Sequence, residues 1–268
     1  MKNRNLDGST LAFAQDGQLI FEEKEHTYRV EGIGEMTPVS HIVAEFFKPF
    51  DAQFWSLRKS RGNPQKAEQL REEWASKGAV ASQAGTYLHK QIENYLNGET
   101  QPILYCCVGY KGKYVHLSEL VDIDREWGFF KAFDAATDYT PFRTEWGVFD
   151  VETRIAGTID LVCVRPDGTY EIYDWKRSNK IDQKEKNPWS DGLHGLEHLS
   201  DTSYVHYCLQ QNLYRYLIEK NYGLKISRMN LVVLHPDYEN YRIVPIPRMD
   251  QEIALMIDYV KQRLNDRS

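Results

Sequence analysis

Two strand-like runs joined by a short turn constrain the fold of this chain more than any other feature. The runs are Thr158–Arg165 and Thr169–Lys176, and Pro166-Asp167-Gly168 lies between them. Proline favours the first position of a type I turn, and glycine tolerates the left-handed conformation that follows it. The segment therefore predicts a hairpin whose three-residue loop is closed by a bulge.

The predicted hairpin brings polar side chains together. Its loop sets Arg165 opposite Thr169, and the same count along both strands sets Asp160 opposite Asp174. Directly opposed residues point to the same face, with their β-carbons roughly 5 Å apart. Strand alternation places Lys176 on that face as well. Two carboxylates and an ammonium group are therefore expected at one end of the hairpin.

Such a cluster has a chemical use. Two close carboxylates either share a proton or bind a hard divalent cation such as Mg²⁺. A lysine beside them can orient or deprotonate a water molecule held by the cation, or neutralise charge that develops on a phosphoryl group. The alternative is a surface hairpin with an Asp–Lys pair and no catalytic role. Because the carboxylates repel each other, replacing Asp160 or Asp174 by Asn is expected to raise stability without metal.

Composition sets wider bounds. The chain has 268 residues, of which 41% are hydrophobic and 27% charged, so we expect one globular domain over residues 1–268. Within it we expect an N-terminal hairpin and helical region (1–78), a core (79–246) and a C-terminal helix (247–268). No apolar run approaches roughly 20 residues, and no secretory signal is recognisable, which predicts a cytoplasmic or intracellular protein without membrane contact. The net charge of −6 disfavours a protein that coats nucleic acid.

Hydrophobic periodicity and turn residues predict the order of the remaining elements. Residues 1–17 are expected to be loosely ordered and 101–116 irregular. Helices are expected at 37–47, opening with Thr37 as the N-cap and Pro38 as the first helical residue, and at 79–97, 117–137, 204–222 and 249–264. Strands are expected in a small hairpin at 19–30 and at 144–152, 229–235 and 241–246.

Two polar segments leave alternatives open. Residues 51–78 are either an amphipathic helical pair with a solvated charged face or a helical flap that offers stacking rings and phosphate contacts to a single strand. Residues 177–201, which include Arg177 and Lys180, are either a disordered surface loop or a loop that contacts substrate. The aromatic and basic residues of the first segment are Phe54, Trp55, Arg58, Lys59, Arg61, Lys66, Arg71, Trp74 and Lys77.

Four short motifs occur in a recognisable order along the chain. They are Gly85-Thr-Tyr-Leu-His89 on a predicted helix, Ala156-Gly-Thr-Ile-Asp160, Tyr173-Asp-Trp-Lys176 and Gln210-x-x-x-Tyr214. This order resembles the RecB-like branch of the PD-(D/E)XK nuclease superfamily, and within it compact exonucleases of phage and mitochondrial type. The resemblance covers roughly residues 20–246. It implies a restriction-endonuclease-like α/β core with a central mixed β-sheet flanked by helices, plus an N-terminal helical embellishment.

The resemblance also implies a role for each matched residue. The catalytic residues are Asp160, Asp174 and Lys176, and Gln210 and Tyr214 brace the site near the DNA. Arg177 and Lys180 follow the site directly and are expected to contact DNA. Glu93 and Glu145 are not counted as ligands, although either could act through water or a second metal. The implied metal ligands are His89, Asp160, Asp174 and the backbone carbonyl of Trp175.

The implied cofactor is Mg²⁺ or Mn²⁺. One sub-branch of the family holds an iron–sulfur cluster by four cysteines, one before the nuclease motifs and three after them. Such a cluster is not expected here, because no cysteine precedes His89 and only Cys208 follows Lys176. The implied activity is that of a metal-dependent deoxyribonuclease, an exonuclease acting on DNA ends or single strands in replication, recombination or repair. Its expected partners are DNA and a helicase, recombinase or single-strand-binding protein. The alternatives are a non-catalytic DNA-binding or scaffold subunit that retains the nuclease fold, and a sugar- or nucleotide-binding enzyme.

Overall fold

The structure is a computed structural model that describes residues 4–22, 27–99 and 101–266. The chain forms two compact units. The first unit contains the chain up to Lys48, Asp138–Val232 and the chain from Arg242 onward, and the second contains Pro49–Thr137 and Val233–Tyr241.

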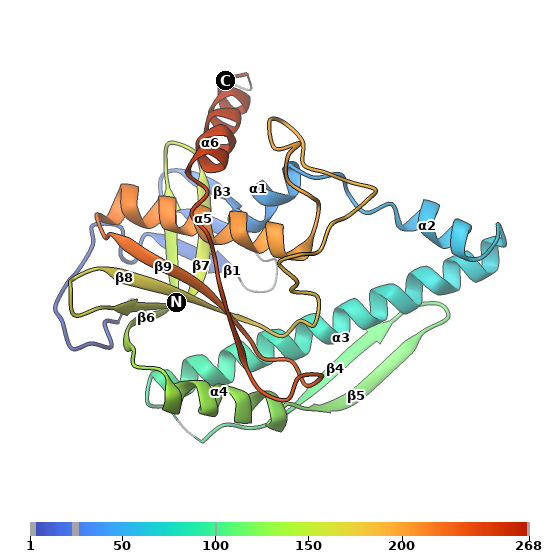
Figure 1. Cartoon of the computed structure of the whole chain (residues 1–268), viewed down its shortest axis with the longest axis horizontal. Coiled ribbons are helices and arrows are strands. Elements are labelled where there is room, and N and C mark those ends of the chain that lie inside the picture. Colours follow the sequence, from blue (N-terminus) through green and yellow to red (C-terminus); the bar gives the residue numbers. More distant parts are fainter. Residues whose placement is uncertain (1–3, 23–26, 100, 267–268) are drawn as a thin grey trace. The chain divides into compact units, whose positions relative to one another are not determined.

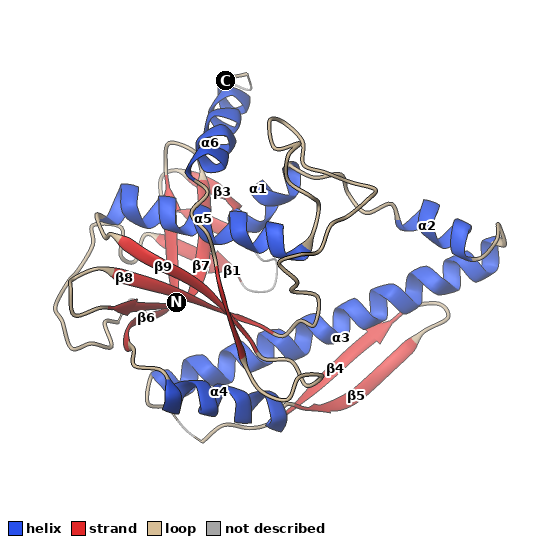
Figure 2. Cartoon of the chain, in the orientation of Figure 1, coloured by secondary structure: helices blue, strands red, loops and turns tan. Residues whose placement is uncertain are grey.

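A mixed sheet forms the centre of the first unit (Figures 1 and 2). The described chain contributes eight strands in the order β1-β2-β3-β7-β8-β9-β10, and β6 pairs with β7 outside this path. β3 pairs with β7 in parallel, whereas β6 and β8 both run antiparallel to β7. The strands are β1 (Leu19–Glu22), β2 (Thr27–Val30), β3 (Gly34–Pro38), β6 (Thr140–Asp150), β7 (Ile155–Val164), β8 (Tyr170–Lys176), β9 (Ile226–Val233) and β10 (Arg242–Pro245).

Three helices accompany this sheet: α1 (Val39–Glu45), α5 (Ser203–Tyr222) and α6 (Asp250–Asn265). Figure 1 shows α5 lying across the strands. Leu209, Leu213 and Leu217 of α5 are fully buried, which is the apolar stripe expected of a helix that covers a sheet. A central mixed sheet with helices against it confirms the predicted α/β class. Pro38 is the N-cap of α1 and Thr37 still belongs to β3, so the predicted start of this helix was one residue early.

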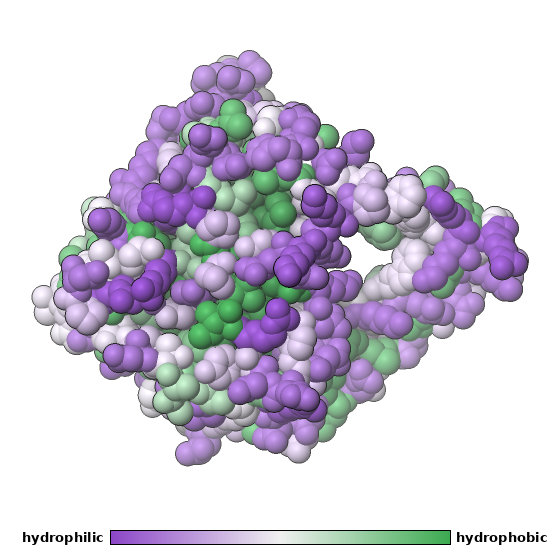
Figure 3. Space-filling model, viewed as in Figure 1, coloured by the Kyte–Doolittle hydropathy of each residue, from purple (hydrophilic) through white to green (hydrophobic). Residues whose placement is uncertain are grey.

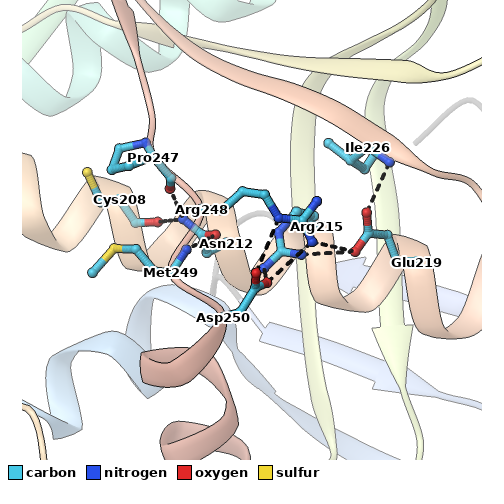
Figure 4. A network of polar contacts seen from close by, with 9 residues as sticks. All are labelled: Cys208, Asn212, Arg215, Glu219, Ile226, Pro247, Arg248, Met249 and Asp250. Carbon is cyan, nitrogen blue, oxygen red and sulfur yellow. Dashed lines mark hydrogen bonds and ion pairs between the residues drawn. The ribbon is translucent and has the colours of Figure 1, made fainter.

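A network of polar contacts fixes α5 to the start of α6 (Figure 4). The amide nitrogen of Asn212 donates to the carbonyl of Pro247 at 2.9 Å, and its oxygen accepts from the backbone N–H of Met249 at 3.0 Å. The buried guanidinium of Arg215 pairs with Glu219 at 3.0 Å and with Asp250 at 2.5 Å. Because several directional contacts act together, they hold α5 in one rotation about its axis.

The N-terminal segment is tied to the sheet, contrary to the loose order expected of residues 1–17. Arg143 of β6 is 1% exposed. Its guanidinium forms an ion pair with Asp16 at 2.7 Å and donates a hydrogen bond to the side-chain oxygen of Asn5 at 2.7 Å. Phe13 stacks on Trp146 with ring centroids 5.4 Å apart. A buried charge requires partners, and here the N-terminal segment supplies them.

The second unit is helical with one separate hairpin. Its elements are α2 (Ala52–Lys59), α3 (Pro64–Leu96), β4 (Tyr105–Lys111), β5 (His116–Asp122) and α4 (Asp124–Ala136). Residues 101–116 were predicted to be irregular and 117–137 helical, and both predictions are wrong over the hairpin. β4 and β5 pair along their full length, and α4 begins only at Asp124. Val108 and Cys106 of β4 are buried in a cluster with Ala84 of α3, so packing on that helix favours the strand conformation.

Within the described residues, no helix combines the length and the apolar character that a membrane crossing requires. Hydrophilic residues cover most of the face that Figure 3 shows.

Candidate metal-binding and catalytic site

The hairpin of β7 and β8 has the predicted register. Leu161 lies opposite Tyr173 and Val162 opposite Ile172. The same register places Asp160 opposite Asp174. The loop closes as predicted, since the backbone N–H of Arg165 donates to the carbonyl of Thr169 at 2.8 Å. Gly168 has a φ of +78°, the left-handed conformation that the turn requires.

The two aspartates of the hairpin differ in burial. Asp174 is only 3% exposed, whereas Asp160 is half-buried. The backbone N–H of Trp175 donates to Oδ2 of Asp160 at 2.8 Å, so β8 itself fixes this carboxylate. A backbone N–H directed at a carboxylate stabilises its ionised form. Asp160 is therefore held in place as an oxygen donor.

Lys176 is the counter-charge of this pair. Its Nζ lies 2.5 Å from Oδ2 of Asp174 and 4.6 Å from the ring centroid of Tyr207 on α5. Burial alone would lower the pKa of Lys176, but the carboxylates of Asp174 and Asp160 outweigh it and raise the pKa to about 12. Without metal, Lys176 is therefore an ammonium group that donates hydrogen bonds and does not accept a proton at neutral pH.

Helix α5 supplies the supports of the site. The amide nitrogen of Gln211 donates to Oδ1 of Asp174 at 2.8 Å, and Gln211 is fully buried. Gln210 instead donates to the hydroxyl of Tyr214 at 3.1 Å. Sequence reasoning selected Gln210 and Tyr214 and missed Gln211, which makes the direct contact. The available signal was a polar residue in the buried stripe between Leu209 and Leu213.

Tyr214 explains the glycine that precedes Asp160. A β-carbon on Gly157 would lie 2.6 Å from Cε1 of Tyr214 and 3.2 Å from a methyl group of Val39. Only glycine lets α5 and α1 approach β7 this closely. Burial raises the pKa of the Tyr214 hydroxyl well above its usual range, so the group stays neutral beside Asp174.

Glu145 lies beside Asp160, although it was not counted among the ligands expected from the sequence. It occupies the β6 position between the pairs Thr144–Leu161 and Trp146–Ile159, across from Asp160. One carboxylate oxygen of Glu145 and one of Asp160 lie within 4.8 Å of each other. The φ of Glu145 is +43°, a left-handed conformation that costs a non-glycine residue about 1–3 kcal/mol. Such strain is typical of functional positions.

The predicted ligand His89 lies on α3 in the second unit, where it is half-buried next to the fully buried Leu88. Glu93, one turn further along, is paired with the ammonium of Lys90 at 2.6 Å. This pairing commits the Glu93 carboxylate to a partner within its own helix.

The residues that follow β8 form a long segment without helix. Arg177 is half-buried and Lys180 is exposed. The backbone N–H of Lys180 donates to the hydroxyl of Ser178 at 3.2 Å, so the chain makes a local turn there. Their predicted contact with DNA stays a prediction.

The donor set of the first unit fits a hard divalent cation. Glu145, Asp160 and Asp174 offer carboxylate oxygens, and Mg²⁺ and Mn²⁺ prefer oxygen ligands. Fixed carboxylates that lie close together are costly unless a cation compensates them. The three acids and Lys176 are therefore the candidate residues for a site of the kind that metal-dependent nucleases use.

A match to a protein-family model identifies the superfamily to which the chain belongs. The model of the PD-(D/E)XK nuclease superfamily matches residues 43–266, and the chain belongs to this superfamily. Membership implies a metal-dependent nuclease that acts on DNA. No curated protein matches the chain. Among solved structures, the crystal structure of SSO0001 is similar at 14% identity, with a TM-score of 0.33, over 85% of this chain and 75% of that one.

Proposed function

We propose that this protein is a deoxyribonuclease of the RecB-like branch, an exonuclease that acts on DNA ends or single strands with Mg²⁺ or Mn²⁺. The observation that carries the proposal is the hairpin of β7 and β8. It holds Asp160, Asp174 and Lys176 on one face, with Glu145 beside them. The resemblance to compact phage-type and mitochondrial-type exonucleases supports action on ends.

The proposed metal ligands are His89, Asp160, Asp174 and the carbonyl of Trp175. We add Glu145 as a proposed carboxylate donor, because it lies across from Asp160 in the register of β6 on β7. A divalent cation bound there lowers the pKa of water and stabilises charge on the phosphoryl group. The backbone N–H of Trp175 fixes the orientation of Asp160, and Gln211 does the same for Asp174.

Lys176 acts as a fixed positive charge in this proposal. Asp174 and the ring of Tyr207 restrain its ammonium group. A restrained ammonium donates hydrogen bonds to the attacking water or to a phosphate oxygen and offsets the charge that develops in the transition state. The raised pKa favours this role over that of a general base. Gln210 and Tyr214 keep α5 against β7 and so position the hairpin.

Arg177 and Lys180 are proposed to contact the DNA backbone beyond the site, as cations that offset phosphate charge. A helicase, a recombinase or a single-strand-binding protein would supply ends or single strands during replication, recombination or repair. An intracellular location belongs to this proposal, because that DNA is intracellular.

A cleavage assay with three substrates tests the proposal. End-labelled single-stranded DNA, blunt duplex DNA and circular single-stranded DNA are incubated with Mg²⁺, with Mn²⁺ or with EDTA. We expect metal-dependent loss of the linear substrates and survival of the circle, and Lys176→Met is expected to abolish most cleavage. Cleavage of the circle would establish endonuclease action. Absence of cleavage by the wild type, or full activity of Lys176→Met, would contradict the proposed function.

The contribution of His89 has its own test. An imidazole ligand favours Mn²⁺ over Mg²⁺ relative to a site made of oxygen atoms alone. The wild type is therefore expected to cleave faster with Mn²⁺, and His89→Ala is expected to lose this preference. If His89→Ala is less stable but keeps the same metal preference, His89 is a packing residue and not a ligand.

A further inference from the structure

The helical pair α2 and α3 carries a stretch of positive charge that the acidic residues of the same segment do not neutralise. From Ala52 to Lys66 the chain has four basic side chains, Arg58, Lys59, Arg61 and Lys66, and no acidic one. The net charge of the whole protein is −6, so this is a local departure from an acidic background. Local basic regions attract phosphate groups even on an acidic protein.

Two acids of α3, Glu68 and Glu72, are engaged by the turn between β4 and β5. Glu72 accepts hydrogen bonds from the backbone N–H groups of Lys113, Tyr114 and Val115 in the turn between β4 and β5, at 2.5–2.9 Å. Glu68 accepts from the hydroxyl of Tyr114 at 3.1 Å and pairs with the ammonium of Lys113 at 3.3 Å. Both carboxylates thus serve the β4–β5 turn and not the bases of α2.

Trp74 points away from those acids. It follows Glu72 by two residues, which is a rotation of about 200° around a helix. The ammonium of Lys59 lies 5.8 Å from the centroid of the Trp74 ring, and the ring of Phe50 meets Trp74 edge-on at 5.9 Å. Across the described ranges no carboxylate forms an ion pair with Lys59.

These residues line a pocket of about 420 Å³, which lies in the range of small-ligand sites, roughly 300–1,000 Å³. The guanidinium of Arg58 lies 5.4 Å from the centroid of the Trp55 ring, so each tryptophan has a cation beside it. Phe50 is 68% exposed, although it borders the pocket. The lining is Phe50, Trp55, Arg58, Lys59 and Trp74.

The pocket is built on a fixed support. The guanidinium of Arg71 on α3 donates to the hydroxyl of Ser56 on α2 at 2.9 Å, and Ser56 is fully buried between the helices. The side-chain oxygen of Asn63 caps the start of α3 by accepting from the backbone N–H of Lys66 at 3.0 Å.

We propose that this pocket binds an unpaired nucleobase of single-stranded DNA by stacking on Trp74, while Lys59 and Arg58 contact the phosphates on either side of it. Exposed rings with adjacent cations are the combination by which proteins hold single strands without reading their sequence. A single strand supplies the complementary charge, because its phosphates face a segment from Ala52 to Lys66 that has four basic side chains and no acidic one. The inference rests on the proposed nuclease function only for the identity of the ligand.

Binding is tested on the full chain in EDTA, so that cleavage does not interfere. Fluorescence anisotropy measures the affinity for a short fluorescein-labelled single-stranded oligonucleotide and for a blunt duplex of the same sequence. Trp74→Leu is expected to bind the single strand about 5- to 150-fold more weakly, the range found when one stacking ring is removed. Tyr105→Leu is the matched control, since Tyr105 is 53% exposed on β4 of the same unit and lies outside the pocket.

Lys59→Gln keeps the helix intact and provides a second measurement. It is expected to reduce the slope of log affinity against log salt by about 0.7, the value for one phosphate contact with a single strand. The exposed Lys111 of β4 provides the charge control, and Lys111→Gln should leave this slope unchanged.

The possible outcomes distinguish failure of the proposed base-binding pocket from failure of the proposed nuclease function. Wild-type affinity in Trp74→Leu, an equal loss in Tyr105→Leu, or an equal loss for single strand and duplex overturns the inference. Weakened binding by Trp74→Leu supports the pocket even if the wild type never cleaves DNA, a result that defeats only the proposed nuclease function. Normal cleavage by the wild type together with normal binding by Trp74→Leu defeats only the pocket.

Discussion

Replacing Lys176 by Met tests whether the ammonium group stabilises the site in the absence of metal. The side chains of Lys176 and Asp174 are 15% and 4% exposed and their charged atoms are 2.5 Å apart. Removing one partner of a buried ion pair costs about 3–5 kcal/mol, because the other charge stays buried without compensation. Gln211 still donates to Asp174 in the variant, so we expect the lower end, about 3 kcal/mol.

A double-mutant cycle measures this interaction. Asp174→Asn is expected to destabilise by about 1–2 kcal/mol, since Asp160 remains near the unpaired ammonium, and the double variant by no more than about 1 kcal/mol. The ion pair thus reverses the stabilisation that two repelling carboxylates alone would predict for Asp174→Asn. Thermal unfolding in EDTA at neutral pH should show a fall of roughly 6–12 °C for Lys176→Met.

Adding metal tests whether Asp174 is a ligand. Saturating Mn²⁺ compensates the Asp174 carboxylate, so it should reduce the stability gap between wild type and Lys176→Met. A gap of the same size with and without Mn²⁺ would contradict the ligand role of Asp174. A double variant whose loss equals the sum of the two single losses would show that Lys176 and Asp174 do not interact.

Three further predictions follow from the same site. Gly157→Ala should destabilise by about 1–2 kcal/mol in chemical denaturation, because overpacking against Tyr214 outweighs the entropy gained by removing a glycine; equal or higher stability would mean that the contact relaxes freely. Glu145→Gln should weaken Mn²⁺ binding in calorimetry about tenfold or more while the control Glu93→Gln does not, and equal affinities would remove Glu145 from the donor set. In EDTA, the stability that Lys176 adds should be complete below about pH 10.5 and lost as the pH rises through about 12, because its folded-state pKa is raised; a stability gap to Lys176→Met that persists at higher pH would contradict the pairing.

Local chemistry accounts for what could be predicted from the sequence. The β7–β8 hairpin follows from one turn, because the left-handed Gly168 and the loop length set the register of every pair behind it. Helix α5 was predicted within one residue of its start, and Gly223 ends it with a φ of +68°. α3 begins at Pro64 with Asn63 as its N-cap, so it is one continuous helix across Gly78 and not a separate helix from residue 79. A helix of 33 residues tolerates that glycine, which costs about 1 kcal/mol.

What could not be predicted depends on contacts between distant residues. Leu117, Leu120 and Val121 have helical spacing, yet they lie on β5, because pairing with β4 and the packing of that hairpin on α3 outweigh local preference. The contact of Gln211 with Asp174 requires knowing the rotation of α5, which the contacts of Asn212 and Arg215 with the chain around α6 determine. Glu145 is near Asp160 only through the register of β6 on β7.

The left-handed backbone of Glu145 has a consequence for which residues evolution retains at position 145. Glycine or asparagine would adopt that conformation at less cost. If Glu145 is the metal donor that we propose, a related chain that no longer cleaves DNA would gain about 1 kcal/mol by replacing it. In a related chain that has lost activity, position 145 should therefore be substituted early, before the two aspartates that the hairpin and α5 hold by hydrogen bonds. Sequencing this one codon in diverged copies would distinguish lineages that still cut DNA from those that have kept only the fold.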